Sequence, residues 1–156
     1  MERRDFMRKS SGAVALGLAA SAGLVPAVSR AQAGASWNKA AFEAKSLNDV
    51  VKAMGGAAPT ESKDVVLAAP EIAENGSVVR IGAQSNLPGT TSIAFVVEKN
   101  PNALAAVFDI PEGTDANVAT NVKMGQSSHV YAVARVGDKF FYSAKEVKVT
   151  LGGCGG

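Results

Sequence analysis

The stretch that decides the fold reads HVYAVARVGDKFFYSAKEVKVTL, residues 129–151. A first run at 129–136 is followed by Gly137-Asp138, a pair typical of a hairpin tip. Residues 139–142 return, and residues 145–151 alternate polar and apolar side chains as a half-buried strand does. The stretch therefore predicts antiparallel strands that return on one another.

Short apolar runs separated by turn residues continue upstream of this stretch. Further candidate strands lie at residues 65–67, 77–83, 92–97, 104–110 and 118–124. The breaks between them carry residues typical of turns, at 74–76, 87–89, 100–102, 111–113 and 125–127. Seven or eight short strands at regular spacing predict a mainly β chain, an immunoglobulin-like antiparallel β-sandwich.

A short helical segment precedes these strands. Ser36 can cap a helix that includes Trp37, and Ser46 can cap a second helix, with Asp49 three residues later as a weak capping-box acid. Apolar residues at helical spacing follow Ser46 until Gly55-Gly56 ends the pattern: Leu47, Val50, Val51 and Met54. We expect this helix to face the core.

The first 33 residues are typical of an export signal. Arg3, Arg4 and Phe6 follow a twin-arginine pattern, a small apolar run covers residues 12–28, and Ala31-Gln32-Ala33 is a small-x-small cleavage site. We expect export to the periplasm by the twin-arginine route, with a general secretory signal as the alternative. The predicted divisions are a signal peptide at 1–33, a helical segment at 34–62, the sandwich at 63–151 and a glycine-rich arm at 152–156.

Charge and composition exclude some classes of function. The formal net charge is +2, and the first 33 residues carry +3, which leaves the remainder at −1. No broad basic surface is therefore expected, which argues against binding to nucleic acid or to a membrane surface.

The chain shows no pattern typical of an enzyme. His129 is the only histidine, so the three or four ligands of a zinc site are not assembled, and we read it as a structural or partly exposed strand residue. Gly82 and Gly89 fit turns and not a phosphate-binding loop. We therefore expect no metal, no cofactor, no catalytic residue and no enzyme activity in this chain alone.

The last residues are the informative segment for function. Cys154 is the only cysteine, so an intramolecular disulfide is excluded and a free thiol or an intermolecular bond is expected. The glycines around it are Gly152, Gly153, Gly155 and Gly156. Glycine accepts nearly all backbone conformations, which predicts a thin, flexible arm. Because a thiolate forms and exchanges bonds to other sulfur atoms, the arm predicts a covalent carrier of sulfur on Cys154.

The chain resembles a known family along most of its length. The stretches that carry the resemblance are residues 57–62, 69–76, 97–101, 122–127 and 145–156, the last including Gly-Gly-Cys-Gly-Gly. They resemble the Y subunit of the sulfur-carrier heterodimer in the Sox thiosulfate-oxidation system. The resemblance implies an immunoglobulin-like sandwich paired with a related Z subunit (SoxZ), and Cys154 as the residue that bears sulfur.

The same resemblance implies further partners. A haem-containing enzyme would join thiosulfate oxidatively to Cys154, a hydrolase would release sulfate, and in some members a sulfane dehydrogenase would oxidise the remaining sulfur. Two other interpretations remain open. One is an exported binding module that dimerises through one disulfide, and the other is a carrier that bears sulfur as a thiocarboxylate on the terminal Gly155-Gly156.

Overall fold

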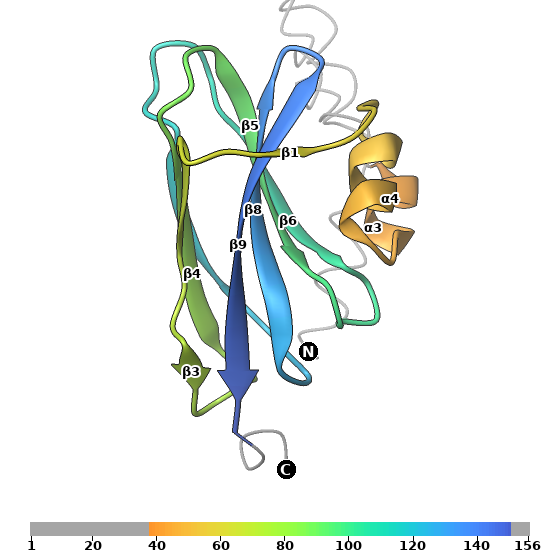
Figure 1. The fold of residues 1–156 in the computed structure, drawn as a ribbon, viewed down its shortest axis with the longest axis vertical. Coiled ribbons are helices and arrows are strands. Elements are labelled where there is room, and N and C mark those ends of the chain that lie inside the picture. The colour runs from red at the N-terminus through yellow and green to blue at the C-terminus, as the bar shows by residue number, and fades with distance from the viewer. Residues whose placement is uncertain (1–37, 151–156) are drawn as a thin grey trace, which may run out of the picture. The chain divides into compact units, whose positions relative to one another are not determined.

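The computed structural model describes residues 38–150 (Figure 1). Its elements, in chain order, are α3 (Lys39–Glu43), α4 (Leu47–Ala53), β1 (Thr60–Glu61), β2 (Val65–Ala68), β3 (Ile72–Ala73), β4 (Val79–Ser85), β5 (Thr90–Val97), β6 (Leu104–Asp109), β7 (Asn117–Val122), β8 (Ser128–Val136) and β9 (Lys139–Val149). None of the helices in this described part is long and apolar enough to cross a membrane.

Two sheets form the body of the fold. The larger has the order β1-β9-β8-β5-β6, with β3 also paired to β9, and the smaller has the order β2-β4-β7. The ladders among β5, β6, β8 and β9 and those of the smaller sheet are antiparallel, whereas β1 and β3 pair with β9 in parallel. The predicted β-sandwich with short helices before its strands is confirmed.

Strand β5 explains how the layers are arranged, because both of its faces are buried. Ile93, Phe95 and Val97 belong to the core cluster that also holds buried residues of the smaller sheet. Ala94 and Val96 point the opposite way and pack in the cluster that contains the helices. Successive side chains of a strand alternate between faces, so this unbroken apolar run places β5 in the middle of three layers.

The two helices cover the larger sheet: Val50 and Val51 of α4 and Ala41 of α3 are buried in the cluster that also contains Phe140 of β9. Gly56 is required here, because a Cβ at this position would lie 2.4 Å from the Phe140 ring and 2.7 Å from Val51 Cγ1. The core-facing helix is therefore as predicted.

The ends of the helices follow the capping rules. Ser46 caps α4, its hydroxyl accepting the Asp49 N–H at 3.2 Å and donating to the Asp49 carboxylate at 2.6 Å, as the sequence suggested. Gly55, at φ +89°, follows the cap, and the amides of Gly55 and Gly56 donate to the Lys52 and Val51 carbonyls, which is a Schellman arrangement.

The cap predicted for the first helix is wrong. Asn38 caps α3, and its side chain accepts the Ala41 N–H at 3.1 Å. Ser36 and Trp37 lie outside the described residues. Asn38 directly precedes the first helical turn, so its side chain reaches the free N–H of Ala41.

The strand pattern differs from expectation in two respects. The runs at 139–142 and 145–151 join into the single strand β9, because Ser143 and Ala144 continue the register with β8. The short strands β1 and β3 carry no period of their own, and β1 lies within the segment 34–62 that was expected to be helical. The hairpin tip is as predicted, with Gly137 at φ +58°.

Candidate functional site

Cys154 and its four neighbouring glycines lie outside the described residues, as do Arg3, Arg4 and Phe6 of the predicted export signal. The structure describes instead the point from which the arm departs, which we call the arm root: the end of β9 and Thr150. The described part of the candidate site is the strand that leads to the arm.

Strand β9 leads to the arm root, and near its end apolar side chains that face the core alternate with polar side chains that face solvent. Val147 is fully buried in the core between the sheets, and Val149 packs against that core while partly exposed. Lys148, between them, is exposed. The side chains of Val147 and Val149 thus pack the last residues of β9 against the core of the sandwich.

On one edge of β9, the arm root is bonded to the segment around β3. The Lys148 N–H donates to the Glu71 carbonyl at 2.9 Å, and the Thr150 N–H donates to the Ala73 carbonyl at 3.1 Å. The Thr150 hydroxyl donates to the Glu74 carbonyl at 3.2 Å. Three bonds therefore fix this edge up to the last described residue.

On the other edge, a side chain replaces the missing strand partner. Strand β8 begins at Ser128, which pairs with Val147, so the Val149 N–H lies beyond the ladder. The Ser127 hydroxyl accepts this N–H at 2.9 Å in a partly buried position. At residues 148–150, the end of β9 is therefore hydrogen-bonded on both of its edges.

The segment around β3 is itself anchored, so it can hold the root. Ala73 is buried in the core between the sheets. The Met124 N–H donates to the Gly76 carbonyl at 2.7 Å, and the Asn75 side chain accepts the Ser77 N–H at 2.9 Å. Sequence reasoning missed this anchoring role, because two-residue strands and lone serines carry no periodic signal.

The position of the root bounds the reach of the arm. Cys154 is the fourth residue after Thr150. Four extended residues span at most about 14 Å. A partner that acts on the Cys154 thiol must therefore come close to the end of β9.

A second polar group lies on the face of the larger sheet that also bears the helices. His129 Nδ1 lies 3.6 Å from the Glu98 carboxylate, with both side chains about half exposed. The Tyr131 and Tyr142 rings pack edge to face at 5.8 Å. Burial raises the pKa of Tyr131, with smaller contributions from the charge and hydrogen bond of Glu98.

His129 is half exposed on β8, in agreement with the prediction of a partly exposed strand residue, and its ring lies 6.3 Å from the Tyr131 ring. Among residues 38–150, no three His, Cys, Asp or Glu side chains gather in a way that could hold a metal ion.

Comparison with known proteins gives one informative structure. The sulfur carrier protein SoxY from Chlorobium limicola f thiosulfatophilum is 32% identical, covers 67% of this chain and 96% of its own, and superposes with a TM-score of 0.61. A lytic polysaccharide monooxygenase from Jonesia denitrificans is 16% identical, with a TM-score of 0.34 over 59% of this chain and 58% of its own. No curated protein sequence matches.

The family comparison covers both the sandwich and the arm. The family described as "Sulfur oxidation protein SoxY" matches residues 50–154, a range that begins in α4 and ends at the single cysteine. With the shared fold and the identity to a solved member, this match is decisive. The chain belongs to the SoxY family of sulfur oxidation proteins.

Proposed function

We propose that this chain carries the sulfur intermediates of thiosulfate oxidation covalently on Cys154 and presents them to partner enzymes. The observation that carries the proposal is the family match, which reaches Cys154 itself. The anchored arm root supports it, because residues 148–150, which end four residues before the thiol, are hydrogen-bonded on both sides of the strand. A rigid body with a short arm suits a carrier that must offer one sulfur to several sites.

The proposed chemistry takes place on the thiol sulfur. The Cys154 thiolate and the outer sulfur of thiosulfate form an S–S bond, and the two electrons released pass to a haem-containing partner. Hydrolysis by a second enzyme then releases sulfate and leaves a persulfide on Cys154. A sulfane dehydrogenase, where one is present, oxidises that remaining sulfur. The chain itself supplies the attachment atom and its access, and the partners supply redox and hydrolytic chemistry.

An uncovered surface of the sandwich supports a second subunit, which we propose to be a SoxZ-like chain. The outer face of the β2-β4-β7 sheet carries Ala68, Gly82 and Ala119 in one cross-strand row. A shallow hollow of about 720 Å³ lies over this row, and Val66 beside it is 47% exposed. This row of small residues lies in a hollow that Arg80, Gln84 and Asn117 also line, which suits packing of an apolar centre with a polar rim against another sandwich.

Light scattering of the native complex tests this partner. We expect a heterodimer, and we expect Gly82→Glu to dissociate it, because a Cβ fits at Gly82 and the carboxylate would then stand at the centre of the face. A stable monomer with no copurifying subunit would contradict the proposal of a second subunit.

We also propose export to the periplasm by the twin-arginine route. The sequence pattern of Arg3 and Arg4 followed by Phe6 supports it. Replacing both arginines with lysine is expected to leave the unprocessed chain in the cytoplasm, measured by fractionation. Normal export of that variant would contradict the route but not the carrier function.

Intact-mass analysis of the protein from thiosulfate-grown cells tests the carrier function. In the unmutated chain we expect mass increases that correspond to one bound thiosulfonate group or to added sulfur atoms, and we expect reduction to remove them. In Cys154→Ser we expect no such increase. Adducts that persist in Cys154→Ser would favour a thiocarboxylate at the terminal glycine. A disulfide dimer without any sulfur adduct would favour the binding module.

A further inference from the structure

One edge of β9 is left open between two short strands. Strand β9 pairs with β8 along its length, from Lys139 to Val147. On its other edge, β1 pairs only with Phe141 and Tyr142, and β3 pairs only with Lys148 and Val149. Residues 143–147 thus have no strand partner on that edge within the described chain. Figure 1 shows β1 crossing the upper part of β9 and β3 lying beside its end.

The backbone groups that face this open edge can be identified from the bonds at its two ends. The Tyr142 carbonyl accepts the Ser62 N–H at 2.9 Å, and the Lys148 N–H donates to the Glu71 carbonyl at 2.9 Å, both on this edge. Backbone groups alternate between the edges of a strand, so Ala144 and Glu146 direct their N–H and C=O groups to the same side.

These four groups are free in the described part of the chain. Ala144 and Glu146 are exposed, and no backbone or side-chain group among residues 38–150 bonds their N–H or C=O groups. A row of unpaired strand groups is a template for another extended chain.

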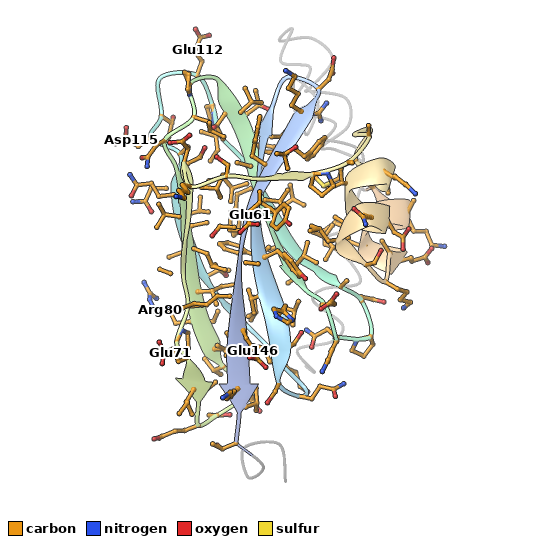
Figure 2. The ribbon with its side chains drawn as sticks, in the orientation of Figure 1. Glu61, Glu71, Arg80, Glu112, Asp115 and Glu146 are labelled. Atoms are coloured by element: carbon orange, nitrogen blue, oxygen red, sulfur yellow. The ribbon has the colours of Figure 1, made fainter. Side chains whose placement is uncertain are left out.

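A hollow lies beside the open edge. It has a volume of about 330 Å³ and is lined by Glu71, Ile72, Lys145, Glu146 and Lys148. Figure 2 shows Glu71 and Glu146, two of these residues, near the end of β9. Ile72 is 59% exposed, so the hollow offers an apolar contact between charges of both signs. The space can receive the side chains of an added strand.

We propose that an extended segment of the enzyme that takes the arm adds to this edge as a strand. The proposal rests on the proposed carrier function. The open edge lies on the strand that ends in the arm, and Glu146 is eight residues before Cys154. An enzyme that holds the arm therefore sits within reach of the edge. The open stretch, residues 143–147, is about 17 Å long and admits about five residues of a partner.

The open edge is already ordered before a partner segment binds. Strands β1 and β3 pair with β9 on both sides of the gap, so little ordering of β9 is needed when a segment binds. Main-chain bonds to Ala144 and Glu146 would supply affinity, and the hollow would supply preference for side chains at alternate positions of the guest. Docking at the edge would align the arm with the site of the enzyme.

Amide hydrogen exchange with the haem-containing loading enzyme tests the proposal directly. The full processed chain is used with Cys154→Ser, so that complexes form without turnover. We expect exchange at Ala144 and Glu146 to slow at least about tenfold on adding the enzyme. The Ser143 and Lys145 amides face β8 and serve as internal controls that stay slow throughout.

Unchanged exchange at Ala144 and Glu146 in a formed complex would overturn the proposal. Protection that rises with the concentration of this chain alone would also overturn it, because the occupant would then be a second copy. Protection in the complex combined with no loading of the unmutated chain would sustain the edge contact and count against the carrier function instead.

A matched pair of variants gives the second test. Ala144→Pro removes an N–H that faces the open edge and leaves the ladder with β8 intact, and edge positions tolerate proline. Ala144→Val keeps the N–H. We expect KM for enzymatic loading of the chain to rise about tenfold in the proline variant and less than twofold in the valine variant. Labelling of Cys154 by a small alkylating reagent and the melting temperature check that the thiol and the fold are unchanged. Equal KM in both variants would refute the contact.

Discussion

The arm root provides the sharpest test of how the fold presents the thiol. Ser127→Ala removes the hydroxyl that accepts the Val149 N–H at 2.9 Å, and no strand partner can replace it, because β8 begins only at Ser128. The bond is partly buried. A hydrogen bond of this kind contributes about 0.5–1.5 kcal/mol net, so we expect the end of β9 to lose about 1 kcal/mol.

This loss of stability should be seen first as more frequent local opening at the end of β9. A change of 1 kcal/mol shifts the opening equilibrium about fivefold, so the Val149 amide should exchange about five times faster in Ser127→Ala. If the end of β9 opens only with the whole domain, the melting temperature should instead fall by about 4 °C. NMR-detected hydrogen exchange and a thermal melt on the same sample distinguish the two cases.

The control removes a hydroxyl from the same strand end in a different role. Thr150→Val deletes the exposed bond to the Glu74 carbonyl, a group that can bond water instead. We expect its effect to stay below about 0.5 kcal/mol. Unchanged Val149 exchange in Ser127→Ala, or an equal increase in Thr150→Val, would refute the reasoning about the root.

Three further predictions concern the arm, the helix contact and the tyrosine pair. Gly153→Val should leave the melting temperature and small-reagent labelling unchanged and sharply lower enzymatic loading, because the wider arm no longer enters a narrow channel; normal turnover would contradict this account of the arm. Gly56→Ala should cost about 1–3 kcal/mol in a denaturant titration, since its Cβ strikes an aromatic ring, whereas Gly125→Ala meets nothing within 4 Å and should stay within about 0.5 kcal/mol. The pKa of Tyr131 is raised, so the contribution of its protonated ring to stability is complete below pH 10.0 and is lost as the pH rises through the pKa in the folded state. Glu98→Gln should lower this pKa toward 10.0 in an NMR titration of the ring, and burial should still keep it above 10.0.

Much of the fold could be predicted because its strands carry a local signal. Alternation marks the second half of β9, and the apolar run of β5 marks a strand buried on both faces. Glycines at tight turns, such as Gly137, placed the ends of strands correctly. Each of these signals depends on residues next to one another in the sequence.

The unpredicted parts depend on contacts between distant residues. Strands β1 and β3 contain two residues each, and they exist because β9 offers an edge more than 75 residues later in the chain. The Ser127 hydroxyl accepts the Val149 N–H only because β8 begins at Ser128 and so provides no backbone partner for Val149. The chemistry proposed for the candidate site rests on Cys154 and its glycines, which are neighbours in the sequence, whereas the bonds that hold the arm root join residues far apart in it.

The length of β9 has a mechanical consequence for the proposed carrier function. A pull on the arm enters β9 at its end and acts along the strand. The ladder with β8 contains nine register pairs, and its hydrogen bonds lie across the direction of pull. They therefore bear the load together in shear and do not open one at a time. If a partner enzyme draws on the arm, as the proposed carrier function requires, the sandwich that anchors the arm is therefore expected to stay folded.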